Sequence, residues 1–203
     1  MATETTPAEE AERTPEELVA LVAQLTETER RIMGLVAMGW PDREISKTIF
    51  LLPYTKVTLR VSQINARLRL PSNYRRPMAL FYVEHMLPTD LAGTPRDPSK
   101  PAYTEPGEKL EEWRVQAERI RAKLREAGAL TPRVVEAAML LADPNNAKKT
   151  KAELAELMSK PSVNPATYGK FVGRLTCFMR HGSMTKVAVV ARLAPFTVND
   201  ELV

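Results

Sequence analysis

Residues 25–70 read LTETERRIMGLVAMGWPDREISKTIFLLPYTKVTLRVSQINARLRL, and this stretch decides the fold. Thr26 with Glu29 three residues later predicts a capping box at the start of a first helix, which Gly39 ends. Asp42 predicts the N-terminal cap of a short second helix. Three short helices in this order, with a tight turn before the last one, are the layout of a helix-turn-helix unit.

The third helix of this stretch begins after Pro53 and carries one apolar stripe. Its apolar residues recur at spacings of four, three and four, which is the period of an α-helix with one buried face. We expect that face to consist of Val57, Val61, Ile64 and Leu68. Between residues 53 and 70 there is no acidic residue, so the opposite face is basic and available for a partner.

The outward face of this third helix has the chemistry of a DNA reader. Lys56 and Gln63 suit hydrogen bonds to base edges, Leu59 suits a thymine methyl group, and the arginines suit phosphates. We therefore predict DNA contacts from Thr55, Lys56, Thr58, Leu59, Arg60, Ser62, Gln63, Arg67 and Arg69. The alternative is a solvated basic helix in a small helical domain, although solvated faces usually mix charges of both signs.

Several short motifs in residues 25–70 resemble the LuxR/FixJ-type (GerE-like) helix-turn-helix domain. They are Leu25-Thr26 with Glu29, Gly39-Trp40, Glu44-Ile45-Ser46, Val57 with Val61, and Arg67-Leu68. The resemblance covers about a third of the chain and implies a transcription regulator whose third helix enters the major groove. It also implies a fourth helix over residues 73–86 that forms a homodimer contact. Sigma factor region four shares the opening pattern and the helix order, so a polymerase-binding relative is an alternative.

Residues 130–193 look like a more divergent copy of the first stretch. Thr131 before Pro132 predicts the start of a first helix, and Thr150 with Glu153 predicts a capping box at the next. The last helix of the copy again has an apolar stripe with helical spacing, formed by Tyr168, Val172, Leu175 and Met179. The sequence therefore predicts a second helix-turn-helix-like unit.

This second unit offers two further groups of candidate DNA contacts. The outward face of its last helix predicts contacts from Thr167, Lys170 and Arg174. A loop between its first two helices would contact phosphates through the clustered Lys148, Lys149 and Lys151. The alternative is a packing domain of helical hairpins that binds no ligand.

The composition divides the chain into five segments and predicts an all-α protein. Residues 1–15 form an acidic leader that we expect to be disordered, and residues 16–87 form the LuxR-like domain. The prolines of residues 88–107 predict an extended linker. Residues 108–128 predict an amphipathic helix that packs on its own C-terminal half or pairs as a dimer zipper. Residues 129–203 form the second helix-turn-helix-like domain.

Charge points to a nucleic-acid partner. The formal net charge is +4, and the basic residues concentrate in the two helix-turn-helix-like segments. Residues 25–87 hold ten basic against five acidic residues, and residues 129–203 hold ten against six. Binding to a phosphate backbone requires such basic surfaces.

Other residue usage argues against catalysis. The chain has one cysteine, two histidines far apart and no Gly-rich phosphate loop, so we expect no enzyme activity, no metal and no cofactor. No targeting signal or membrane span is recognisable. We therefore expect a cytoplasmic, nucleoid-associated regulator from a bacterium or phage that binds double-stranded DNA through tandem helix-turn-helix domains. The alternative is an adaptor that binds RNA polymerase or another regulatory protein through the basic helices.

Overall fold

A computed structural model describes residues 15–49, 53–70, 75–88, 110–159, 161 and 163–198. Within these ranges the chain forms helices and no β-strand, so the predicted all-α class is confirmed. The predicted acidic leader and Pro-rich linker lie almost wholly outside the described residues. Among the helices that are described, none combines the length and the apolar character needed to cross a membrane.

The N-terminal half contains a run of short helices. They are α1 (Pro15–Ala23), α2 (Glu27–Ala37), α3 (Asp42–Thr48), α4 (Tyr54–Arg67) and α5 (Arg75–Phe81), and the π-helical turn η1 (Tyr82–Met86) extends α5. The predicted capping box is present at α2. The Glu29 backbone N–H donates to the Thr26 hydroxyl, and the Thr26 backbone N–H donates to the Glu29 carboxylate. The capping box thereby satisfies two of the backbone amides that have no partner within the helix.

The predicted cap of α3 is wrong. The N-cap residue is Pro41, and Asp42 is already the first helical residue. The Asp42 carboxylate instead accepts a hydrogen bond from the Thr58 hydroxyl at 2.8 Å and forms an ion pair with Arg75. Because these partners lie on α4 and α5, Asp42 ties its helix to the next two helices and does not satisfy its own backbone.

The C-terminal half begins with the long helix α6 (Leu110–Glu126). It continues with α7 (Pro132–Ala142), the 3₁₀ turn η2 (Pro144–Asn146), α8 (Lys151–Leu157), α9 (Pro165–Thr176) and α10 (Met184–Leu193). Thr131 is the N-cap of α7, and the predicted capping box of Thr150 and Glu153 starts α8. The helix order of the predicted second unit is therefore present.

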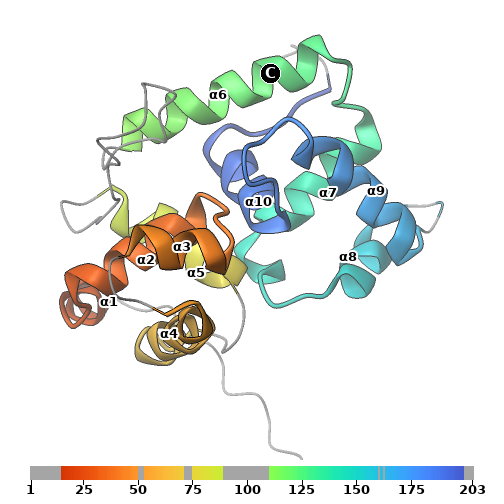
Figure 1. The fold of residues 1–203 in the computed structure, drawn as a ribbon. Helices are drawn as coiled ribbons and strands as arrows, with labels where there is room; N and C mark the ends of the chain where they lie inside the picture. Colours follow the sequence, from red (N-terminus) through yellow and green to blue (C-terminus); the bar gives the residue numbers. More distant parts are fainter. Residues whose placement is uncertain are drawn as a thin grey trace, which may run out of the picture.

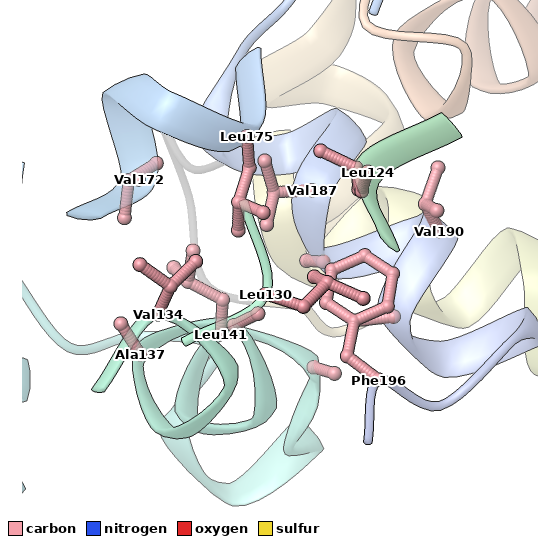
Figure 2. Packing of buried hydrophobic residues seen from close by; sticks show 14 of the residues in the cluster. Leu124, Leu130, Val134, Ala137, Leu141, Val172, Leu175, Val187, Val190 and Phe196 are labelled. Carbon is pink, nitrogen blue, oxygen red and sulfur yellow. The ribbon is translucent and has the colours of Figure 1, made fainter. Parts of the chain in front are cut away.

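Two apolar clusters form the core. The first contains residues of α2, α3 and α4, including the fully buried Ile32, Ile45 and Ile64. The second lies among the helices of the C-terminal half, and Figure 2 shows Leu141, Leu175 and Val187 as parts of it that come from α7, α9 and α10. Each half thus buries its own apolar stripe behind its third helix.

Some residues of each half also pack in the cluster of the other half. Leu80 of α5 belongs to the second cluster, whereas Val189 of α10 and Trp113 of α6 belong to the first. The remaining buried face of α6 packs in the second cluster, as predicted for a helix that covers its own half, through Ala117, Ile120 and Leu124. The halves are therefore in direct apolar contact, and Figure 1 shows them side by side with α6 running along them.

The fourth helix of the N-terminal half offers no dimer surface. α5 packs against α2 and α10, and every residue from Arg76 to Phe81 is buried. A helix buried on all sides is part of a core. The homodimer contact that the resemblance implies for residues 73–86 is contradicted for the part of this segment that the structure describes, because α10 of the same chain already covers it.

Gly39 marks a close approach between the halves. Its φ is +81°, and a Cβ there would lie 2.7 Å from the His181 carbonyl oxygen and 2.9 Å from the Lys186 Cβ. Gly128 has a similar φ of +61°, but a Cβ there would meet nothing within 4 Å. The two glycines therefore share a left-handed backbone and differ in what lies against them.

We expect Gly39→Ala to lower the free energy of unfolding more than Gly128→Ala does. Each substitution costs about 1–2 kcal/mol because an L residue is strained in the left-handed region. Only at position 39 must the two halves also move apart. Urea unfolding of both variants beside the wild type measures the difference, and equal losses would show that the approach at Gly39 contributes nothing.

Candidate nucleic-acid interface

Helix α4 presents the two faces that its sequence predicts. The stripe that packs inward is buried and consists of Val57, Val61, Ile64 and Leu68. The opposite face is exposed and carries Thr55, Lys56, Leu59, Arg60, Gln63 and Ala66, with Ser62 half-buried beside them. Leu59, in the middle of this face, is 55 % exposed. Figure 1 shows α4 at the periphery of the molecule.

Hydrogen bonds from side chains organise this exposed face. The Arg60 guanidinium donates to the Gln63 side-chain oxygen at 3.1 Å, and the Ser62 hydroxyl donates to the Thr58 carbonyl at 3.2 Å. The Thr58 hydroxyl donates to Asp42 of α3, so this predicted DNA contact braces the two helices against each other. Lys56 and Gln63 are exposed on the side of the helix opposite the buried stripe.

Arg67, a predicted phosphate contact, is engaged within the fold. Its guanidinium donates to both carboxylate oxygens of Glu29, at 2.7 and 2.8 Å. The Glu29 side chain is only 5 % exposed and also accepts from Thr26, so it needs a cationic partner inside the fold. Arg67 therefore clamps the end of α4 to the start of α2. The neighbouring Arg69 is exposed and adopts a positive φ of 52° where the helix ends.

One exposed aromatic residue was missed by the sequence interpretation. Tyr54 is the first residue of α4 and is 58 % exposed, next to Thr55 and Lys56 on the same helical turn. Its position directly after Pro53, ahead of the buried stripe, is the signal that was available. A phenol at this place, three residues before the buried Val57, adds a hydrogen-bonding group and an aromatic surface at the N-terminal end of α4.

The first group of candidate residues in the second half lies on α9. Lys170 and Arg174 are exposed and Thr167 is half-buried, while Tyr168, Val172 and Leu175 of the predicted stripe are buried. Met179, predicted for the same helix, is also buried but lies beyond the end of α9 at Thr176. The Tyr168 hydroxyl donates to the Ala137 carbonyl at 3.0 Å, and burial raises the pKa of this phenol well above its usual range. In Figure 1 α9 lies apart from α4, so the two sets of candidates do not form one patch.

A buried arginine of the N-terminal half holds the lysine-rich loop before α8. Lys148 and Lys151 are exposed and Lys149 is half-buried. The buried Arg76 guanidinium of α5 donates to the backbone carbonyls of Asn146, Ala147 and Lys149, the last at 2.8 Å. Burial lowers the pKa of Arg76, yet an arginine stays charged at neutral pH. The loop is thus fixed to the N-terminal half.

A small pocket lies where the halves meet. Its volume is about 270 Å³, and its lining includes Trp40, Arg75, His181 and Ser183. The His181 ring lies 5.1 Å from the Trp40 ring, and the Arg75 guanidinium donates to the Trp40 carbonyl at 2.9 Å. Among the described residues no group of three or more His, Cys, Asp or Glu side chains is placed to hold a metal ion. The candidate DNA contacts lie outside this pocket, on α4, on α9 and in the lysine-rich loop.

Comparisons with protein-family models, with curated proteins and with solved structures find no match for this chain. The resemblance to LuxR/FixJ-type domains therefore stays a prediction from the sequence. The inference of function depends on the geometry of α4 and of the surfaces around it.

We expect Arg67→Ala to lower the free energy of unfolding by about 1–3 kcal/mol, because the buried Glu29 carboxylate loses its charged donor. Arg60→Ala on the exposed face of the same helix is the matched control, and it should change stability by less than about 0.5 kcal/mol. Chemical denaturation at neutral pH measures both. If Arg67→Ala were as mild as its control, the clamp between α4 and α2 would be unimportant.

Proposed function

We propose that this protein is a sequence-specific transcription regulator that binds double-stranded DNA, with α4 as a reader helix in the major groove. The observation that carries the proposal is the exposed face of α4, where Lys56, Arg60 and Gln63 surround the exposed Leu59 and no acidic residue interrupts them. The buried stripe behind this face supports the helix along its whole length. Such a helix fits the major groove of B-DNA.

The side chains of this face match the groups that DNA displays. Gln63 and Lys56 hydrogen-bond base edges, Leu59 contacts a thymine methyl group, and Arg60 neutralises a phosphate. Asp42 and Thr58 hold α3 against α4, which fixes the angle between the helix that crosses the backbone and the helix that enters the groove. Preformed geometry of this kind limits the ordering cost of binding.

The C-terminal half contributes a second set of contacts in this proposal. Lys170 and Arg174 are exposed on α9, and Lys148 and Lys151 are exposed in the loop before α8. These side chains are exposed and positively charged, and they suit a polyanion such as DNA. The two helix-turn-helix-like units then act in tandem, in the cytoplasm and in association with the nucleoid.

A second candidate function is binding to RNA polymerase or to another regulatory protein. The exposed Tyr54 and Leu59, 58 % and 55 % exposed, favour it, because aromatic and apolar side chains form the centres of protein interfaces. Salt dependence separates the two functions. Binding to DNA should weaken log-linearly with salt because counterions are released, whereas a protein interface built around Leu59 should respond weakly.

Selection of bound fragments from random DNA by the purified protein tests the proposal, and substitutions then test the reader helix. We expect Lys56→Ala and Gln63→Ala each to weaken binding to the selected site by about 1–3 kcal/mol. Lys123→Ala is the control, because this lysine is exposed on α6, away from α4. Unchanged affinity in both reader variants, with the fold intact by circular dichroism, would exclude α4 as the reader.

Arg60→Ala should weaken binding to all DNA sequences alike, because Arg60 is assigned to a phosphate. We expect it to reduce the slope of log affinity against log salt by about one unit. Titrations of specific and nonspecific duplexes at several salt concentrations measure this slope. A loss confined to one base position would instead assign Arg60 to a base edge.

A further inference from the structure

Two runs of four helices repeat the same plan, α2 to α5 in the N-terminal half and α7 to α10 in the C-terminal half. Below, the first to fourth helices of each half are the helices of these runs in order. In each run the third helix buries three apolar residues with spacings of four and three, Val57, Val61 and Ile64 in α4 and Tyr168, Val172 and Leu175 in α9. A fourth residue with a further spacing of four, Leu68 or Met179, is buried just after the helix ends. The first helix of each half also begins at a threonine, since the N-cap is Thr26 in one and Thr131 in the other. The structure therefore supports the internal repeat.

The fourth helices join the two repeats. α5 packs on α2 of its own half, α10 packs on α7 of its own half, and α5 and α10 pack against each other. Both helices are buried around most of their circumference, from Arg76 to Phe81 in α5 and from Lys186 to Ala191 in α10. An ion pair of Glu84 with Arg192, at 2.6 Å, adds to this contact.

The contacts beside the fourth helices are reciprocal. Near the start of α5, Arg76 donates to carbonyls in the loop that joins the first and second helices of the other half. Near the start of α10, His181 and Lys186 lie against Gly39, in the loop that joins the first and second helices of the N-terminal half. Such an exchange, in which each unit offers the same parts to the other, is the pattern of a two-fold dimer interface.

We infer that this chain is a single-chain counterpart of a two-fold dimer, and that one copy binds one asymmetric DNA site made of two unlike half-sites at a fixed spacing. The inference rests on the proposed function. When the two stripes are superposed in register, Lys56, Leu59 and Gln63 correspond to Thr167, Lys170 and Arg174. Their side chains differ in donors and apolar surface, so the two half-sites differ in sequence.

The internal contact also determines how many copies bind. α5 and α10 cover each other, so neither is available to a second chain. Because the halves pack together, α4 and α9 are held at a fixed distance from each other. The spacing between the two half-sites on the DNA must match that distance. A flexible tandem of two readers would tolerate changes of this spacing, and a rigid one does not.

The first experiment uses no DNA. A protease site is inserted after Pro95, between the halves, and the intact folded protein is cleaved. We expect the two fragments to elute together as a one-to-one complex. In the cleaved protein Arg76→Met should weaken their association by about tenfold or more, since three carbonyls lose a charged donor, while Lys123→Ala leaves it unchanged. Fragments that separate, or that each pair with themselves, overturn the inference.

The second experiment uses the duplex obtained by selection. Native mass spectrometry should show one chain on each duplex, and Gln63→Ala and Arg174→Ala should relax base preference at opposite ends of the site. Insertion of about five base pairs, half a helical turn, between the ends should reduce affinity by about a hundredfold, because the two readers no longer engage together. A tolerated insertion overturns the fixed spacing.

The outcomes distinguish this inference from the proposed function. A palindrome bound by two chains keeps the proposed function and overturns the inference. If the fragments stay together after cleavage but no duplex is selected, the proposed function is wrong and the asymmetric DNA site is overturned with it.

Discussion

The buried guanidinium of Arg76 connects the two halves of this molecule. It lies on α5, which belongs to the N-terminal half, and it satisfies three backbone carbonyls around η2, which belongs to the C-terminal half. Loss of this charged donor to the loop carbonyls would make the packing of α5 against the C-terminal half less favourable, because a buried polar group that loses a partner is costly. The apolar contact and the arginine therefore depend on each other.

The exposed surfaces follow from this arrangement. Because α5 and α10 occupy the centre, the third helix of each half lies on the outside with its stripe turned inward. Glu29 holds α4 to α2 through Arg67, and Asp42 holds α3 to α4 through Thr58 and to α5 through Arg75. Basic residues near a helix face thus divide into two groups, those that secure the helix and those that remain at the surface.

The sequence predicted what depends on neighbours along the chain. The stripe of α4, the stripe of α9 and the capping boxes at Thr26 and Thr150 follow from spacings of three or four residues, and the structure has all of them. The pairing of Arg67 with Glu29 and of Arg76 with Asn146 joins residues 38 and 70 positions apart, and no local pattern encodes it. For the same reason the burial of α5 was not predicted: its apolar sequence suits a second chain as well as α10.

The order of synthesis gives the buried α5 a further consequence. α5 ends at Phe81, and α10 begins only at Met184. At a translation rate of roughly 5–20 residues per second, the helix emerges from the ribosome about 5–20 seconds before its covering partner. During that interval the nascent N-terminal half lacks the partners of Leu80, which packs in the second cluster of the finished protein. A chain that stops before Met184 therefore lacks α10, the helix that packs against α5 in the finished protein.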